Sequence, residues 1–203
     1  MIEPLENLMR ALAKLPGLGQ RSAGRAALAL LREQERLLVP LVSSLINARD
    51  TVTYCPQCGA FTQKNQIPCS LCSNPSRSSD IICVVEEPAD VLTVDASGAF
   101  KGKYHVLGGK LSPVKHVGPE KLRISELKDR IARENIAEIL LALSTDMEGD
   151  ATVGYIVETL RNFPSPSNAV KVTRLAFGLP ADSGVAYSDP LTLKRAILHR
   201  CDA

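Results

Sequence analysis

The chain has 203 residues, of which 45% are hydrophobic, enough for one good core or for two compact modules with smaller cores. It has no Trp and only 4% aromatic residues, which argues against a carbohydrate-binding or single-strand stacking platform built on aromatic rings. The net charge of +2 excludes a uniformly basic nucleic-acid binder, so contact with nucleic acid depends on how the charges are distributed.

The first fifty residues have the pattern of a small helical unit. Apolar residues recur at helical spacing from Leu5 to Leu15, until Pro16 and Gly17 stop the pattern. A second helix is predicted to begin at about Ser22, which is a suitable N-cap. A third apolar helix is predicted over 37–47 and completes the unit.

A basic hairpin joins the first two predicted helices. Its turn contains Gly17 and Gly19, and five basic residues with no acidic one surround it: Arg10, Lys14, Arg21, Arg25 and Arg32. In a helix-hairpin-helix arrangement, N–H groups at the start of the second helix can meet a DNA phosphate, and glycines allow a close approach. This favours binding to the DNA backbone without sequence preference. The alternative is a plain helix–helix turn with solvated basic side chains.

Residues 54–78 have few large apolar side chains and cannot build a core alone. This segment contains two Cys-x-x-Cys pairs, formed by Cys55, Cys58, Cys69 and Cys72. Two thiolate pairs at this spacing are typical of a closed tetrahedral zinc site, so we predict one structural Zn²⁺ per chain. The alternative is four buried or disulfide-bonded cysteines. Cys83 and Cys201 lie outside the pattern and are expected to be inert packing residues.

After Asp80 the pattern alternates between buried strands and helices. Strands are predicted at 81–85, 104–107, 138–143 and 171–176, and helices at 89–95, 124–134 and 151–162. This alternation predicts a parallel sheet. A last helix is predicted to begin at Asp189 and Pro190 and to run to about Arg200. It lies beyond the sheet unit, so we expect it to pack on a neighbouring molecule.

Acidic residues follow two of the predicted strands. One group is Glu86, Glu87 and Asp90, and the other is Asp146, Glu148 and Asp150. Because the carboxyl ends of parallel strands meet at one edge of a sheet, we expect the two groups to converge. Three uses fit them: recognition of a partner protein, capping of the following helices, and binding of Mg²⁺ for phosphoryl transfer. We favour partner recognition.

The sequence also bears on where the protein works. No apolar run approaches the roughly 18 to 20 residues of a membrane span. Glu3 and Glu6 stand where a secretory signal would carry positive charge. We therefore expect a cytoplasmic protein that does not enter a membrane, and the paired cysteines fit its reducing conditions.

In their order along the chain, these segments closely resemble the RecR family of bacterial recombination mediators, and the resemblance covers essentially the whole chain. It is carried by LPGLGQRSAGRAAL, CPQCG with PCSLCSNPSR, VVEEPADV, VLGGKLSP, LALSTDMEGDAT and the final helix. It implies a multidomain protein of α plus α/β class. The implied parts are a helix-hairpin-helix domain at 1–53, a C4 zinc finger at 54–78, a Toprim domain with a parallel sheet at 79–176 and a C-terminal oligomerisation segment at 177–203.

The resemblance also implies an activity. RecR proteins help to load the recombinase RecA onto single-stranded gaps coated by single-strand-binding protein, together with RecO and RecF, and they form ring-like tetramers. By that resemblance we expect a homodimer or homotetramer that binds single- and double-stranded DNA and joins the nucleoid during repair. The candidate DNA contacts are Arg21, Arg25, Lys14 and Arg10, and the candidate partner contacts are Glu86, Asp146 and Glu148.

Catalytic Toprim domains carry a glutamate followed by Gly after the first strand, and an Asp-x-Asp pair after a later strand. In this chain Glu87 replaces the glycine, and the pair reads Asp146-Met147-Glu148. These departures predict that the chain is not an enzyme, and none of the four tyrosines stands out as a nucleophile. They disfavour Mg²⁺ as a second cofactor but leave its binding at the acidic cluster open. One alternative is a metal-dependent Toprim nuclease or phosphoryl transferase that uses Glu86, Asp146, Glu148 and Asp150. Another is a purely structural scaffold held together by its zinc module.

Overall fold

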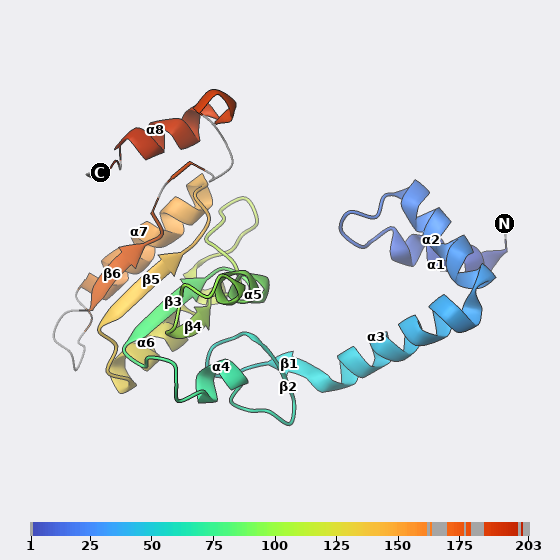
Figure 1. Cartoon of the computed structure of the whole chain (residues 1–203), viewed down its shortest axis with the longest axis horizontal. Helices are drawn as coiled ribbons and strands as arrows, with labels where there is room; N and C mark the ends of the chain where they lie inside the picture. The colour runs from blue at the N-terminus through green and yellow to red at the C-terminus, as the bar shows by residue number, and fades with distance from the viewer. Residues whose placement is uncertain are drawn as a thin grey trace. The chain divides into compact units, whose positions relative to one another are not determined.

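The computed structural model describes residues 2–161, 163, 170–176, 178–179, 185–198 and 200 (Figure 1). Cys201, for which the sequence predicts a packing role, lies outside the described residues, as do parts of the predicted segment 177–203. The chain divides into two compact units, Met1–Val52 and Thr53–Ala203. Within the described ranges, no helix is both long enough and apolar enough to cross a membrane.

The first unit is helical, as predicted. It consists of α1 (Glu3–Leu12), α2 (Gln20–Arg32), a π-helical turn (Gln34–Leu38) and α3 (Val39–Thr51). The predicted cap at Ser22 is wrong, because α2 begins at Gln20 with Gly19 as its N-cap. The reason is the glycine turn: Gly17 has a φ of +77°, and the N–H of Leu18 donates to the carbonyl of Leu15 at 3.1 Å. The chain therefore completes its reversal earlier than the apolar pattern indicates.

Small side chains let α1 and α2 pack closely. Ala23, Gly24 and Ala27 are buried on one face of α2. A Cβ placed on Gly24 would lie 2.8 Å from the Cε of Met9, so the two helices approach as near as a glycine allows. The other face of α2 remains exposed, and it carries Arg21, Arg25 and Arg32.

α3 buries none of its residues. It begins at Val39 and not at 37, because the chain first passes through the π-helical turn. Five large aliphatic side chains of this helix are exposed by 39% to 61%: Val39, Leu41, Val42, Leu45 and Ile46. Contiguous exposed apolar surface of this kind is typical of an interaction site.

The second unit is built on a parallel sheet of four strands in the order β4-β3-β5-β6 (Figure 1). The strands are β3 (Ile81–Val85), β4 (Lys103–Val106), β5 (Glu138–Ala142) and β6 (Lys171–Arg174). Val84 of β3 lies opposite His105 of β4 and Leu141 of β5. The helices between the strands are α5 (Pro88–Ala96), α6 (Ile124–Arg133) and α7 (Met147–Arg161). The predicted alternation and the parallel sheet are confirmed.

Alternate residues of the central strand face two different cores. Ile82 and Val84 belong to the core that α6 and α7 cover, with Leu127, Ile131 and Ile156 among its members. Cys83 and Val85 face the other way, into a core that contains Phe100, Tyr104 and all four paired cysteines. The cysteine segment therefore covers one face of the sheet.

This cysteine segment, residues 54–78, has little secondary structure of its own. It contains the end of β1 (Val52–Tyr54), β2 (Phe61–Gln63) and the short helix α4 (Ser70–Ser73). The N–H of Val106 donates to the carbonyl of Cys58 at 2.7 Å, and Arg123 donates to the carbonyl of Pro56 at 2.9 Å. These bonds attach the segment to the edge strand β4 and to the start of α6.

The last helix, α8 (Pro190–Leu198), begins as predicted. The carboxylate of Asp189 accepts the N–H groups of Leu191 and Thr192, each at 3.0 Å. None of its described residues is buried, and the expectation that it packs on a neighbouring molecule stays a prediction. Arg195 reaches the start of α7, where it donates to the carbonyl of Thr145 and, at 2.8 Å, to Asp150.

His105 of β4 is fully buried. Its Nε2 lies 2.7 Å from the carbonyl oxygen of Arg123, so this nitrogen carries the proton, and its Nδ1 has no hydrogen-bond partner in the described part of the chain. Burial lowers the pKa of this imidazole to about 3. The folded chain therefore keeps His105 neutral at a pH where an unfolded histidine is charged.

A dependence of stability on pH follows from His105. Between about pH 6.5 and pH 3 the unfolded chain binds a proton that the folded chain excludes, so stability falls as the pH falls through this range. The contribution is about 1.4 kcal/mol per pH unit near pH 5. Urea unfolding of the wild type and His105→Gln at pH 7, 6 and 5 checks this, and the variant is expected to show a shallower dependence. Equal slopes would contradict it.

Candidate metal centre and interaction surfaces

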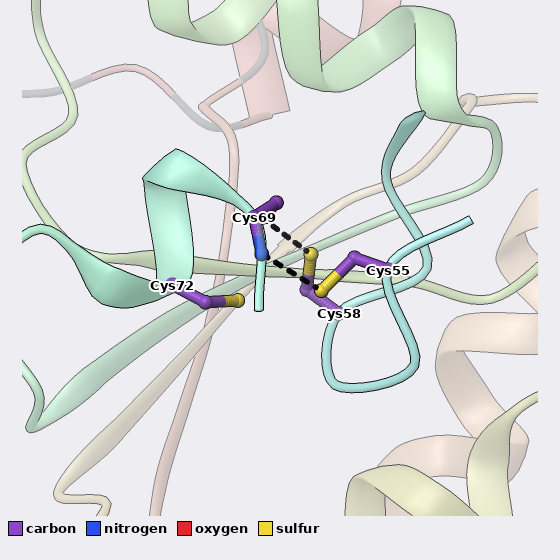
Figure 2. Close-up of side chains that lie close together, drawn as sticks. All are labelled: Cys55, Cys58, Cys69 and Cys72. Atoms are coloured by element: carbon purple, nitrogen blue, oxygen red, sulfur yellow. Dashed lines mark hydrogen bonds between the residues drawn. The ribbon is translucent and has the colours of Figure 1, made fainter. Parts of the chain in front are cut away.

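The four paired cysteines form one buried cluster (Figure 2). Cys55 and Cys58 come from the loop between β1 and β2, and Cys69 and Cys72 come from the start of α4 (Figure 2). The four Sγ atoms all lie within 4.8 Å of one another, and the least buried residue, Cys72, is only 7% exposed. The Sγ atoms of Cys58 and Cys69 are 3.5 Å apart. The sequence prediction that these four residues meet is confirmed.

A glycine makes the tight turn of the first cysteine pair possible. Gly59 has a φ of +79°, and its N–H donates to the carbonyl of Cys55 at 2.8 Å. A Cβ at this position would lie 3.0 Å from Arg123 and 3.1 Å from Val106. Both the conformation and the space therefore require glycine.

The thiols of the cluster influence one another strongly. A hydrogen bond from Cys58 lowers the pKa of Cys69 to about 2, and the same bond raises the pKa of Cys58 to about 12. Hydrogen bonding to Cys58 also raises the pKa of Cys72. The raised pKa values of Cys58 and Cys72 mean that these two thiols resist ionisation, and a bound cation would favour their thiolate forms. The cluster therefore fits a metal ion that prefers sulfur, and a tetrahedral ion held by all four residues has no open position for a substrate.

The glycine hairpin of the first unit presents N–H groups and basic side chains together. No side chain caps the N-terminus of α2, and the position of a Cβ on Gly17 or Gly19 has no neighbour within 4 Å. Arg21 and Arg25 are exposed one helical turn apart on α2. Arg10 and Lys14 are also exposed, and Arg10 donates to the Oδ1 of Asn7 at 2.7 Å. This surface is exposed, and it combines basic side chains with the uncapped backbone N–H groups of α2.

At the carboxyl edge of the sheet, Glu86 and Asp146 converge on a lysine. The Nζ of Lys110 is hydrogen-bonded to Asp146, and it lies 2.9 Å from the Oγ of Ser144 and 3.8 Å from Glu86. Glu86 also accepts the N–H of Ser144 at 2.6 Å. The hydrogen bond from Lys110 lowers the pKa of Asp146 to about 2. Glu86 of the first predicted group and Asp146 of the second therefore meet, but with a cation of the same chain between them.

The other carboxylates after β5 are paired as well. Glu148 accepts a hydrogen bond from Ser112. Asp150 accepts hydrogen bonds from Arg174 at 2.6 Å and from Arg195 at 2.8 Å. The edge is thus a set of carboxylates that already have partners.

Helix capping accounts for part of the acidic pattern. Asp146 accepts the N–H of Gly149 at 2.7 Å in the first turn of α7, and Asp90 accepts the N–H of Glu87 at 2.8 Å at the start of α5. These are the contacts expected where a carboxylate stabilises the positive end of a helix. Glu86 and Glu148 make no such contact in the described structure, so capping does not account for the whole group.

The edge does not fit the divalent cation that a catalytic Toprim domain would hold. Over the described residues, the cysteine cluster is the one group of three or more potential ligands close enough together to hold a metal ion. The oxygens of Glu86 and Asp146 that a divalent cation would use face an ammonium group.

Comparison with known proteins places these features in a family. Residues 5–49 match the family model "RecR, helix-hairpin-helix", and residues 80–176 match the Toprim domain. The chain is 42% identical over 196 residues to the recombination protein RecR of Desulfosudis oleivorans, an alignment that covers 97% of this chain and 95% of that protein. The chain belongs to the RecR family.

Other RecR proteins match over a similar length. The protein of Moorella thermoacetica is 41% identical over 198 residues, covering 98% of this chain and 96% of that protein. The protein of Mycolicibacterium smegmatis is 41% identical over 201 residues, covering 97% and 96%. Membership of the RecR family makes the chain a recombination protein, a class named for its role in recombination and not for a catalysed reaction. The cysteine cluster lies between the two matched RecR and Toprim segments.

Sequence reasoning missed the side chains that neutralise the acidic edge. Lys110, Arg174 and Arg195 come from three segments far apart in the sequence, and no local pattern links them to the carboxylates. The one available signal is the Gly-Gly-Lys sequence that begins two residues after the end of β4, where a glycine turn near a strand end can direct the next side chain toward the site.

Proposed function

We propose that this RecR-family chain is a DNA repair and recombination mediator. It binds single- and double-stranded DNA without sequence preference and, with RecO and RecF, promotes the loading of RecA onto single-stranded gaps coated by single-strand-binding protein. The observation that carries the proposal is the match to RecR proteins over 97% of the chain, with the basic hairpin, the cysteine cluster and the acidic edge in one sequence. It works in the cytoplasm, on the nucleoid.

A direct test is RecA loading on gapped DNA coated by single-strand-binding protein. With RecO and RecF present, the purified chain is expected to shorten the delay before RecA becomes active as an ATPase on the gap. A delay that stays the same with and without this chain would reject the mediator function.

In this proposal the metal is one Zn²⁺ per chain, bound by Cys55, Cys58, Cys69 and Cys72. The support is the chemistry of the ligands, since four buried sulfurs within 4.8 Å of one another are the usual ligand set of a structural zinc site. The zinc orders residues 54–78 and takes no part in a reaction.

DNA binding is assigned to the basic hairpin. Arg21 and Arg25 lie next to the uncapped N-terminus of α2, and Lys14 and Arg10 add positive charge on the α1 side. Such contacts reach phosphates and carry no sequence information, so binding is expected to weaken steeply as salt rises.

Self-association is assigned to the apolar face of α3 and to the C-terminal segment. The five exposed aliphatic residues of α3 suit contact with a second copy of the chain, giving a homodimer that can close into a ring-like homotetramer. A ring would bring several hairpins to one DNA molecule, and this multivalency would offset weak single contacts.

Partner recognition is assigned to Glu86, Asp146 and Glu148. Neutralising all three, as Glu86→Gln with Asp146→Asn and Glu148→Gln, is expected to weaken binding to RecO or RecF about tenfold, because it removes the negative charge that would attract basic groups of a partner. Calorimetric titration with each partner measures this. The matched control is Glu158→Gln, an exposed glutamate of α7 away from the edge. Unchanged affinity for both partners in the triple variant would reject the assignment.

A Toprim nuclease or phosphoryl transferase is the second candidate, because Glu86 and Asp146 do converge at the carboxyl edge. Incubation with supercoiled plasmid in Mg²⁺ or Mn²⁺ separates the two functions. We expect the plasmid to stay intact. Nicking or relaxation that disappears in Glu86→Gln would show that the acidic edge is an active site.

A further inference from the structure

The acidic edge contains a cation that the chain itself supplies. A divalent ion in such a place needs several carboxylate oxygens that are not committed to other cations. Here Lys110 is hydrogen-bonded to Asp146 and to Ser144 and lies 3.8 Å from Glu86. We infer that Lys110 is a built-in counter-ion that keeps divalent cations out of this Toprim edge. The inference does not depend on the recombination role.

The backbone holds Lys110 in place. Gly108 and Gly109 have φ values of +84° and +138°, and the N–H groups of both donate to the carbonyl of Glu86 at 2.9 Å. After the lysine, the N–H of Leu111 donates to the Oγ1 of Thr152 at 2.9 Å. The segment is thus fixed to the end of β3 on one side of Lys110 and to α7 on the other.

Burial makes this ion pair different from an ordinary surface pair. The side chains of Lys110 and Glu86 are only 20% and 16% exposed, whereas exposed pairs contribute little because water screens them. A divalent ion would have to displace an ammonium group that is hydrogen-bonded to Asp146 and Ser144 before it could use these oxygens. The carboxylate of Asp146 is more accessible, at 54% exposed, but the same ammonium group holds it.

Asp150 and Glu148, the other carboxylates after β5, do not supply free ligands for a divalent cation either. Asp150 is held between Arg174 and Arg195, and Glu148 is hydrogen-bonded to Ser112. Lys110 is therefore the side chain whose removal leaves Glu86 and Asp146 together without a counter-ion. With Lys110 present, Glu86 and Asp146 pair with its ammonium group and do not bind a metal ion.

The test uses the zinc-loaded full chain and Mn²⁺ as the probe, with free Mn²⁺ followed by its electron paramagnetic resonance signal. We expect the wild type to bind no Mn²⁺ at this edge and Lys110→Met to gain about one site per chain. The gain in affinity is expected to be at least about tenfold, because the repulsion between an ammonium and a divalent ion exceeds that factor even in water. Methionine keeps a chain of similar length without the charge.

Two further variants identify the site. Lys110→Arg keeps the positive charge and is expected to bind no more Mn²⁺ than the wild type, and Lys110→Met with Asp146→Asn is expected to lose the gained site. Circular dichroism and zinc content show that each variant is folded. Equal Mn²⁺ binding by the wild type and Lys110→Met, or a gain that survives Asp146→Asn, would overturn the inference.

Discussion

A Cys72→Ser chain is expected to purify without bound zinc and to lose the fold of residues 54–78. Structural zinc sites contribute about 10–16 kcal/mol of apparent binding free energy, which is as large as the whole stability of many domains. The damage is expected to reach the sheet as well, because the cysteine cluster shares a core with Cys83, Val85 and Tyr104. Metal analysis and thermal unfolding measure the two effects.

The matched control for Cys72→Ser is Cys83→Ala. Cys83 is also fully buried and belongs to the same core, but it lies on β3 outside the cluster. This control is expected to keep about one zinc per chain and to lose only the stability that a small cavity costs. A Cys72→Ser chain with one zinc per chain and an unchanged melting temperature would show that the cluster is not the zinc site.

Replacing Arg21 and Arg25 with Ala together is expected to weaken DNA binding by one to two orders of magnitude near physiological salt. Each phosphate contact contributes to affinity and to its salt dependence, and in an oligomer the loss is repeated in every subunit. Fluorescence anisotropy with a single-stranded oligonucleotide and with a duplex measures the affinity between 50 and 200 mM salt. The plot of log affinity against log salt is expected to become shallower for both DNAs.

A matched control removes two positive charges elsewhere in the same unit. Arg36→Ala with Arg49→Ala changes the net charge equally, and the side chains of Arg36 and Arg49 are 72% and 73% exposed in ion pairs with Glu33 and Asp50. This control is expected to keep most of the affinity. If both double variants weaken binding equally, net charge and not the hairpin governs the interaction.

Features encoded within a short stretch of sequence could be predicted well. The strand at 81–85 has the predicted bounds, because a continuous apolar run lies between Asp80 and Glu86. The meeting of the four cysteines also follows from local spacing, since each Cys-x-x-Cys pair can present two sulfurs to one ion. For the same reason the cap of α8 at Asp189 could be predicted.

Features that depend on contacts between distant parts of the chain could not be predicted from the sequence. Lys110 and Asp146 are 36 positions apart, and the contact depends on the order of strands in the sheet. The burial of the four paired cysteines, in an otherwise largely exposed segment, depends on the face of a sheet that begins only at residue 81. The sequence places the start of α2 too late because Gly19, the actual N-cap, has no side chain that could accept a hydrogen bond. Ser22 has such a side chain and therefore matches the usual cap pattern better.

The attachment of the cysteine segment to the sheet has a consequence for folding. Because Val106 donates to Cys58 and the cluster lies in the core beneath β3, the segment and the sheet form one cooperative unit. The bound metal then acts as a ligand of the native state of that whole unit, and its free concentration sets how much of the chain is folded. If the metal is zinc as proposed, its withdrawal is expected to unfold the proposed partner-binding edge of the sheet without altering any residue of that edge.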